Sequence, residues 1–259
     1  MPVDTDRLRE AAIRIARAAS AVPMRHFRAP LEIATKADES PVTIADRDTE
    51  AQIRDEIAAA FPGHAIFGEE YGIEGRLDGP TWIIDPIDGT RSFITGHPLF
   101  GMLIGFLDGG VPQLGLVRMP ALDETFVGLR GGGATCNGVP IRCRQTKALS
   151  EALVYVNEPE RMAEADPDLF ARLCRVGHTR RMAYDCYPHA MVAAGRIDVV
   201  VDRGLEPYDY LPLVALVEAA GGVITDWTGR ALTLQSDGRV VTAANPDVHA
   251  EMLAFLNRG

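Results

Sequence analysis

The nonapeptide WIIDPIDGT, residues 82–90, constrains this chain most, because it joins a buried strand to an acidic loop. Its apolar, β-prone start breaks at Asp85-Pro86 and turns at Asp88-Gly89. Proline biases the residue before it away from helix, and Asp-Gly favours a turn. The pattern therefore predicts a strand that delivers two carboxylates, three residues apart, onto one loop.

Carboxylates that lack a cationic neighbour repel one another, and the usual remedies are a raised pKa or a hard divalent cation. A second acidic pair, Glu69-Glu70, follows the short apolar run 65–67, and Gly89-Thr90 closes the loop. Backbone N–H groups of such a loop can bind phosphate oxygens while the carboxylates hold cations. The two stretches together indicate a site for a metal-bound phosphate.

Composition limits the function classes. The 259 residues are 47% hydrophobic, enough for one large domain or two small ones that share a core. The net charge of −10 excludes a basic nucleic-acid surface, and it repels phosphate unless metals invert the local field. Four cysteines without C-x-x-C spacing and six scattered histidines argue against a zinc or redox site and a histidine nucleophile. No signal peptide or membrane span is indicated, so a cytoplasmic location is expected.

The order of the expected elements predicts two halves in one compact unit. Residues 30–42 read as a connection or a β-hairpin, 72–80 as a flexible loop, and 131–133 as a glycine turn rather than a phosphate cradle. The halves, 1–140 and 141–259, would meet near residues 135–150. Periodicity predicts helices over 4–27, 43–60, 167–176, 185–194, 209–220 and 247–256, an antiparallel meander over 99–107, 111–118 and 124–129, and later strands at 152–156, 197–201, 223–225 and 240–243 that alternate with helices.

Three motifs carry a resemblance to a known family. Gly-Glu-Glu at 68–70, WIIDPIDGT at 82–90 and Tyr208-Asp209 resemble the inositol-monophosphatase family of Mg²⁺-dependent, lithium-sensitive phosphatases. The resemblance runs from about Lys36 to about Ala244. The continuation Arg-Ser-Phe after Thr90 is more similar to the histidinol-phosphatase branch than to the inositol branch, which usually carries Thr-Asn-Phe. It implies a homodimer and a layered αβαβα sugar-phosphatase fold, with an antiparallel sheet in the first half and a mostly parallel or mixed sheet in the second.

The resemblance also implies the metal ligands. They would hold two or three Mg²⁺ ions, with Mn²⁺ as a substitute. Glu70 diverges from its neighbour in an extended segment and would act as support. The alternatives are ordinary turn aspartates in the nonapeptide and a helix N-cap at residue 209, where Tyr208 replaces the tryptophan usual in the family. The implied ligands are Glu69 as a bridging ligand, Asp85, the carbonyl of Ile87, Asp88 and Asp209.

Asp46 permits two interpretations that are compatible with each other. It lies three residues after Thr43, so a capping box explains it without function. Alternatively it accepts a hydrogen bond from Thr90, and the pair orients an attacking water whose pKa the metal lowers. Gly89 and Thr90 would bind the phosphate. Lys36 matches a family lysine near the site, but a lone lysine is equally well explained as a solvated side chain.

Substrate choice is expected to depend on the second half. Asp202 aligns with an acidic family residue that contacts the leaving alcohol, and Asp185 stands where the inositol branch is small and neutral. Two carboxylates suit a cationic alcohol such as histidinol better than a neutral polyol. The alternative for Asp185 is a helix N-cap. Three roles stay open for Arg91: a contact with phosphate, with the ring of the alcohol, or with a dimer partner.

The sequence therefore predicts a Mg²⁺-dependent phosphomonoesterase that converts L-histidinol phosphate to L-histidinol and phosphate in histidine biosynthesis. Inositol 1-phosphate or another small sugar phosphate is the alternative substrate. A non-catalytic protein that binds divalent metal is the alternative of another class; the presence of Thr90 and Asp46 argues against it, since ligation alone needs neither. Partners other than a small phosphomonoester and a second copy of the chain are not expected, and neither nucleic acid nor a membrane is among them.

Overall fold

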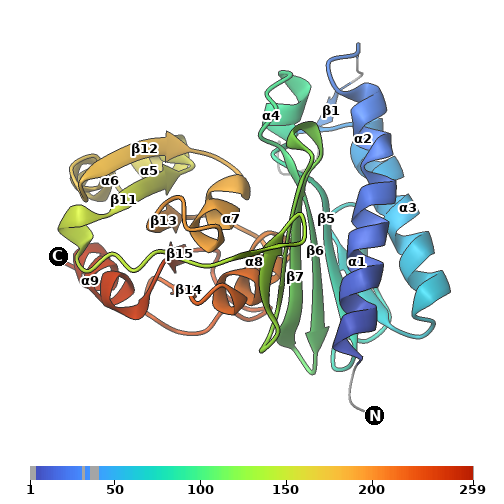
Figure 1. Ribbon diagram of the computed structural model, residues 1–259. Helices are drawn as coiled ribbons and strands as arrows, with labels where there is room; N and C mark the ends of the chain where they lie inside the picture. The colour runs from blue at the N-terminus through green and yellow to red at the C-terminus, as the bar shows by residue number, and fades with distance from the viewer. Residues whose placement is uncertain (1–3, 31–32, 36–40, 259) are drawn as a thin grey trace.

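The computed structural model describes residues 4–30, 33–35 and 41–258. Its elements form successive layers (Figure 1). Helices α1 (Thr5–Ala19) and α3 (Ile44–Ala60) cover one face of a large sheet, and α8 (Pro207–Ala219) lies on the other face. A smaller sheet follows, and helices α5 (Pro159–Ala165), α6 (Pro167–Leu173) and α9 (Pro246–Leu256) pack beyond it. The expected αβαβα layering is confirmed.

The large sheet has eight strands among the described residues, and β5 is one of its inner strands. Its pairs are antiparallel except β3 with β5, which are parallel, so the expected antiparallel sheet contains one parallel pair. The flexible loop expected over 72–80 is partly wrong, because β4 pairs with the edge of β3 there. In spatial order the strands are β10 (Val139–Ile141), β9 (Gly133–Cys136), β8 (Glu124–Leu129), β7 (Val111–Met119), β6 (Gly101–Asp108), β5 (Thr81–Asp88), β3 (Ala65–Gly68) and β4 (Gly72–Glu74).

Three glycines in register let α8 approach this sheet closely. Gly105, Gly115 and Gly128 are partners on the neighbouring strands β6, β7 and β8. A Cβ atom at Gly115 would lie 1.7 Å from the carbonyl oxygen of Pro212 in α8. Any larger residue there would push α8 off the sheet. This close packing sets the depth at which the first turn of α8, with Asp209, meets the end of β5.

The smaller sheet is mixed, as expected for the second half. Strands β12 (Thr179–Ala183), β11 (Leu153–Asn157) and β13 (Val199–Asp202) run parallel, and β15 (Val240–Ala243) and β14 (Val223–Asp226) continue the sheet antiparallel. Helix α7 (Tyr187–Ala193) packs with α8 between the two sheets. The division of the chain into halves at residue 140 stays a prediction.

The remaining elements refine the expected boundaries. The single helix expected over 4–27 is wrong, since the chain forms α1 and then α2 (Ala21–His26), with Ser20 donating its hydroxyl to the carbonyl of Ala16 at 2.7 Å. Strands β1 (Ala34–Thr35) and β2 (Pro41–Val42) pair antiparallel, as the hairpin alternative predicts. Helices α4 (Thr90–Ile94) and α5 and strand β12 were not foreseen from the sequence, and two short 3₁₀ turns, η1 (Pro120–Leu122) and η2 (Leu149–Glu151), complete the described chain.

Candidate active site

The predicted site residues gather around one cavity of about 250 Å³. It lies where the end of β5, the start of α8 and the ends of β11 and β13 meet. Asp46 and Glu70 do not line it, and Lys36 lies outside the described residues. The predicted residues that line the cavity are Glu69, Asp85, Ile87, Asp88, Gly89, Thr90, Arg91, Asp185, Asp202 and Asp209.

A β-bulge explains how Asp85 and Asp88 come to share one side of β5. In a regular strand, residues three apart point to opposite faces. Here the register shifts: Asp85 pairs with Leu103 and Asp88 with Gly101, so three steps on β5 oppose two on β6. The bulge coincides with Pro86, which has no N–H to donate to the ladder. The extra residue turns both carboxylates toward the cavity.

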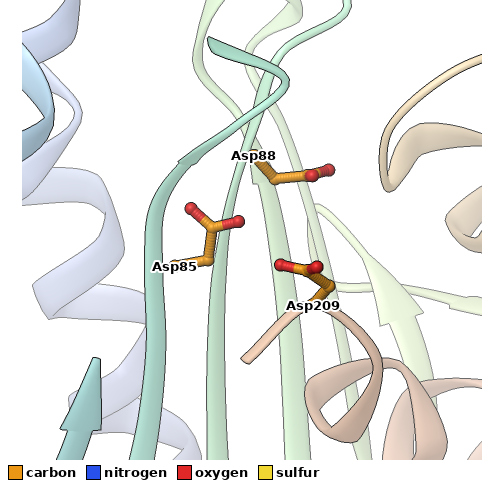
Figure 2. Close-up of side chains that lie close together, drawn as sticks. All are labelled: Asp85, Asp88 and Asp209. Carbon is orange, nitrogen blue, oxygen red and sulfur yellow. The ribbon is translucent and has the colours of Figure 1, made fainter. Parts of the chain in front are cut away.

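Asp209 completes this group, which we call the β5–α8 cluster (Asp85, Asp88 and Asp209; Figure 2). One carboxylate oxygen from each lies within 4.8 Å of the other two. The expected N-cap alternative for Asp209 is wrong: α8 begins at Pro207, and Asp209 is its third residue, accepting the Glu206 N–H at 2.8 Å. Each of the three carboxylates thus accepts one backbone N–H while facing the other two: Asp85 from Ile87 at 3.0 Å, Asp88 from Cys186, and Asp209 from Glu206.

The electrostatics of the β5–α8 cluster favour a bound cation. Burial, together with repulsion from Asp209, raises the pKa of Asp88 to about 8. Burial and then Glu69 raise the pKa of Asp209 to about 8 as well. Burial, followed by repulsion from Glu69 and Asp88, raises the pKa of Asp85 well above its usual range. The buried Asp85 and the partly buried Asp88, Asp209 and Glu69 offer oxygen ligands only, which a hard divalent cation prefers, so these residues fit the metal that the sequence predicts.

Glu69 and Glu70 take different positions, as expected for neighbours in an extended segment. Glu69 follows β3, lines the cavity, and donates its backbone N–H to the carbonyl of Ile84 at 3.2 Å. Glu70 donates its backbone N–H to Glu50 Oε2 at 2.7 Å. Glu50 is fully buried on α3 and is paired with Arg54 at 2.8 Å, so it fixes the loop that carries Glu69. The sequence reasoning did not single out Glu50.

Both interpretations of Asp46 are compatible with its geometry. It is the third residue of α3, and its Oδ2 accepts the Thr43 N–H at 2.8 Å and the Thr43 hydroxyl at 2.6 Å, which is the capping box. Its Oδ1 lies 3.3 Å from the hydroxyl of Thr90. That hydroxyl is equally close to the carbonyl of Ile87, at 3.3 Å. Asp46 therefore caps a helix with one oxygen and presents the other to Thr90.

A second acidic group stands at the carboxyl ends of the three parallel strands, where ligands usually bind in open α/β sheets. We call Glu158, Asp185 and Asp202 the strand-end cluster. Glu158 follows β11 directly, Asp185 follows β12 by two residues, and Asp202 ends β13. All three line the cavity. Adjacent strands therefore each contribute one carboxylate to the cavity that the β5–α8 cluster also lines.

Asp185 is held in an uncommon backbone conformation. Its φ is 62°, and its Oδ2 accepts the Ser92 hydroxyl at 2.8 Å. The N-cap alternative is wrong, since α7 begins at Tyr187 and Cys186 precedes it as the cap. A Cβ atom at Gly89 would lie 2.6 Å from the Asp185 carboxyl carbon, so only glycine at 89 permits this approach. Burial, followed by repulsion from Asp88, raises the pKa of Asp185 to about 8.

Asp202 is buried and held by side chains that the sequence reasoning missed. Its Oδ2 lies 3.0 Å from His189 Nε2 and accepts a hydrogen bond from Asn157 Nδ2 at 2.7 Å. Its Oδ1 accepts the Arg203 N–H at 2.8 Å. His189 in turn contacts Thr242 Oγ1 at 2.8 Å through Nδ1. A scattered histidine gave no signal for this role.

Glu158 is the cavity residue that sequence reasoning missed most clearly. Its φ is 46°, and its N–H donates to the carbonyl of Ala183 at 3.1 Å, across to the end of β12. Burial, then Asp202 and Asp185, raise the pKa of Glu158 to about 7, although Arg161 at 3.6 Å opposes them. A carboxylate followed by proline at the end of an apolar strand is the same signal as Asp85-Pro86, and it was present in the sequence.

Comparison with known proteins decides the family. The sequence model described as the inositol monophosphatase family matches residues 4–258. The chain belongs to the inositol monophosphatase family. It is accordingly a phosphatase of a family that depends on divalent metal. No helix in the described part of this family member is long and apolar enough to cross a membrane.

Individual relatives of this phosphatase differ in name. The chain is 39% identical to the chloroplastic bifunctional phosphatase IMPL2 of Arabidopsis thaliana, over 98% of this chain and 76% of that protein. It is 37% identical to a histidinol-phosphatase of Chlorobaculum parvum, over 96% of each. Among solved structures, an inositol monophosphatase from Zymomonas mobilis superposes with a TM-score of 0.84 at 36% identity, covering 96% of this chain and 97% of that one.

Proposed function

We propose that this phosphatase hydrolyses L-histidinol phosphate with the help of bound divalent cations. One observation supports this most: a single cavity is lined both by the β5–α8 cluster and by the strand-end cluster. The first cluster suits metal and phosphate, and the second suits a cationic alcohol. The phosphorus–oxygen bond of the ester would lie between them.

Glu69, Asp85, Asp88, Asp209 and the carbonyl of Ile87 would hold Mg²⁺, in two or three ions, with Mn²⁺ as a substitute. When bound, such ions lower the pKa of water and neutralise charge on the phosphate and on the leaving oxygen. The carboxylates themselves have raised pKa values in the metal-free protein, so they release protons as a cation enters.

Thr90 and Asp46 would act on the attacking water. Asp46 Oδ1 is within reach of the Thr90 hydroxyl, and Asp46 is itself fixed by the capping box at the start of α3. The hydroxyl orients the water in line with the ester bond, and the water proton passes through it to Asp46. The water oxygen bonds to phosphorus as the phosphorus–oxygen bond to the alcohol breaks. The leaving oxygen takes a proton from a solvent water, and Asp46 returns its proton to solvent. Gly89 and Thr90 bind the phosphate on the loop side. A protein that only bound metal would need neither Thr90 nor Asp46.

The strand-end cluster supports the choice of substrate. Histidinol carries an amine, and Asp185 lines the cavity with its carboxylate anchored on Ser92. The name of the Chlorobaculum relative, a histidinol-phosphatase, agrees with this choice. The Zymomonas structure keeps inositol 1-phosphate as the second candidate. Arg91 lines the same cavity, and the proposal keeps all three of its roles open: a contact with phosphate, with the ring of the alcohol, or with a dimer partner.

Phosphate release from a small panel of esters tests the proposal. With Mg²⁺ present, kcat/KM for L-histidinol phosphate should exceed that for myo-inositol 1-phosphate by at least about tenfold, the effect of roughly 1.4 kcal/mol. Chelation by EDTA should remove activity, and Mg²⁺ should restore it. Equal or reversed preference would contradict the substrate, while activity insensitive to EDTA would contradict the mechanism. On the family alone, we further propose that the protein is a cytoplasmic homodimer, that it serves histidine biosynthesis and that lithium inhibits it.

A further inference from the structure

A second, larger cavity adjoins the one already described. It encloses about 620 Å³ and shares Arg91, Glu158 and Asp185 with the first cavity, so the two are divided by a wall of three charged residues. Tyrosine and methionine side chains contribute much of the rest of its lining. These are Tyr155, Tyr184, Tyr187, Met182 and Met191. Such a lining suits a flat, partly apolar group.

Glu158 is placed to serve both cavities. Its side chain is 17% exposed, and its backbone is fixed by the hydrogen bond to Ala183 at the end of β12. Arg161, the cation beside it, stands 3.6 Å away and also donates to the carbonyl of Gly204 at 2.8 Å. Glu158 therefore presents a largely buried carboxylate whose protein partner is distant and shared.

Charge in the second cavity favours a basic group next to Glu158. Arg91 and Arg181 also line this cavity and are exposed to solvent, which screens their charge in part; Arg91 opposes the rise in the Glu158 pKa without cancelling it. Glu160 lines it too, and accepts the Tyr184 hydroxyl at 2.9 Å. Burial and the neighbouring Asp202 and Asp185 act against the charge of Glu158, and an entering cation would relieve that cost.

We propose that Glu158 and the tyrosine-lined second cavity bind the imidazole ring of the substrate, so that Glu158 is a specificity-determining residue. This inference rests on the proposed function. In L-histidinol phosphate the carbon next to the ester carbon bears the amine, and the ring follows one methylene further on. If the phosphate binds at the β5–α8 cluster and the amine binds Asp185, the imidazole ring would extend past Glu158 into the second cavity. A ring nitrogen donates to the carboxylate, and the ring face packs on tyrosine.

A pair of substrates isolates the ring. L-Alaninol phosphate has the same ester and amine but no imidazole. Replacing Glu158 by glutamine should lower kcat/KM for L-histidinol phosphate about 10–100-fold, mainly through KM, because a hydrogen bond to a charged group is worth roughly 1.5–3 kcal/mol. The same variant should change kcat/KM for L-alaninol phosphate by less than about threefold. Glu158→Asp should recover part of the loss.

Matched variants separate a local effect from a general one. Glu164→Gln removes a carboxylate from the exposed side of the same helix, α5, and should leave both substrates unchanged. Tyr184→Ala, at a side chain that is 43% exposed and so tolerates truncation, should weaken only the substrate with a ring.

Two results would overturn the inference. In the first, Glu158→Gln affects both substrates by the same factor or affects neither. In the second, the wild-type protein turns over both substrates equally well. If wild type hydrolyses L-alaninol phosphate or inositol 1-phosphate but not L-histidinol phosphate, the proposed function fails together with the inference. An equal loss on both substrates, with wild-type preference for L-histidinol phosphate intact, removes the role of Glu158 alone.

Discussion

Two groups of acids line one cavity, yet the protein treats them differently. The three carboxylates of the β5–α8 cluster accept backbone N–H groups of Ile87, Cys186 and Glu206, and their side-chain contacts are with the Cys186 thiol and with one another. The strand-end cluster has side-chain partners: Ser92 for Asp185, His189 and Asn157 for Asp202, and Arg161 for Glu158. The cations that line the first cavity in the described part of the chain, Arg91 and Arg161, act on Asp185 and Glu158.

This difference teaches what each group can bind. A cluster whose side-chain neighbours are mostly other carboxyl groups keeps its mutual repulsion, which an ion of high charge density relieves. Carboxylates that side chains already orient need no metal to hold them in place, and they suit an organic cation that binds and leaves in each turnover. One cluster is therefore suited to retaining a metal, and the other to choosing an alcohol.

The largest expected effect comes from the β5–α8 cluster. Asp88→Asn should reduce phosphatase activity by at least about 100-fold, because metal contributes several kcal/mol to stabilising the transition state. The amide oxygen can still accept the Cys186 N–H, so the fold should persist. Steady-state assays over a Mg²⁺ range, together with circular dichroism, check this. An Asp88→Asn variant with unchanged activity at every Mg²⁺ concentration would remove Asp88 from the metal site.

The loss of activity expected from replacing Thr90 lies between the losses expected for the two clusters. Thr90→Ala should lower kcat by about 10²–10⁴-fold, the usual contribution of general acid–base assistance, while Mg²⁺ binding stays the same. Thr90→Ser retains the hydroxyl and should keep most of the activity. Pre-steady-state kinetics must show that chemistry limits the rate. A kcat near that of wild type for Thr90→Ala would leave Asp46 with its capping role alone.

In the strand-end cluster the effect should be smaller and selective. Asp185→Asn should cost about 10–100-fold in kcat/KM for L-histidinol phosphate, since it removes a charge-assisted hydrogen bond of roughly 1.5–3 kcal/mol. The rate for inositol 1-phosphate should change little. Asp202→Asn is the less specific probe, because it also disturbs the buried contact with His189. An equal fall in kcat/KM for both substrates would show that Asp185 supports the fold or the metal site and does not select the substrate.

The pH dependence of metal stabilisation should be the smallest effect. Asp88 and Asp209 have folded pKa values of about 8, above an unfolded value of about 3.9, so the cost of their burial is absent below about pH 4 and complete above about pH 8. The free energy of unfolding of the metal-free protein therefore falls as pH rises through this window, and bound Mg²⁺ offsets the fall.

At about 100 times the Kd, Mg²⁺ adds roughly 2.7 kcal/mol, or about 5–10 °C in Tm. Thermal melts at about pH 5.5 and about pH 8.5 should show the larger Mg²⁺ shift at the higher pH. A larger shift at the lower pH would contradict the electrostatic account of the β5–α8 cluster.

Local sequence predicted the parts of the site that covalent spacing determines. Asp85 and Asp88 are brought together by Pro86 and the bulge, all within one stretch. The motifs also predicted that Asp209 and Glu69 belong to the same cavity, and that is where the structure places them. Asp46 was left with two interpretations: the capping box is confirmed, and the role with Thr90 on an attacking water stays a prediction.

Elements that depend on tertiary neighbours were missed. Nothing local marks β12 as the partner of β11, and without that pairing the ends of three parallel strands cannot be seen to meet. Glu158 and Asp185 adopt positive φ without being glycine, which no turn signal predicted. Strand β4 forms only because β3 offers an edge. The break between α1 and α2 is a different case: Pro23 stands in the first turn of α2 and cannot continue a helix from α1, a local signal that the expectation of one helix over 4–27 did not use.

Calorimetric titration of Mg²⁺ into Asp88→Asn and Asp185→Asn tests the division between the two clusters most directly. The substitutions are the same in chemistry, and both side chains line one cavity. We expect Asp88→Asn to lose Mg²⁺ binding by at least about tenfold in Kd and Asp185→Asn to bind Mg²⁺ within about threefold of wild type. Equal weakening in both variants, or the reverse order, would contradict the account that one cluster holds the metal and the other chooses the alcohol.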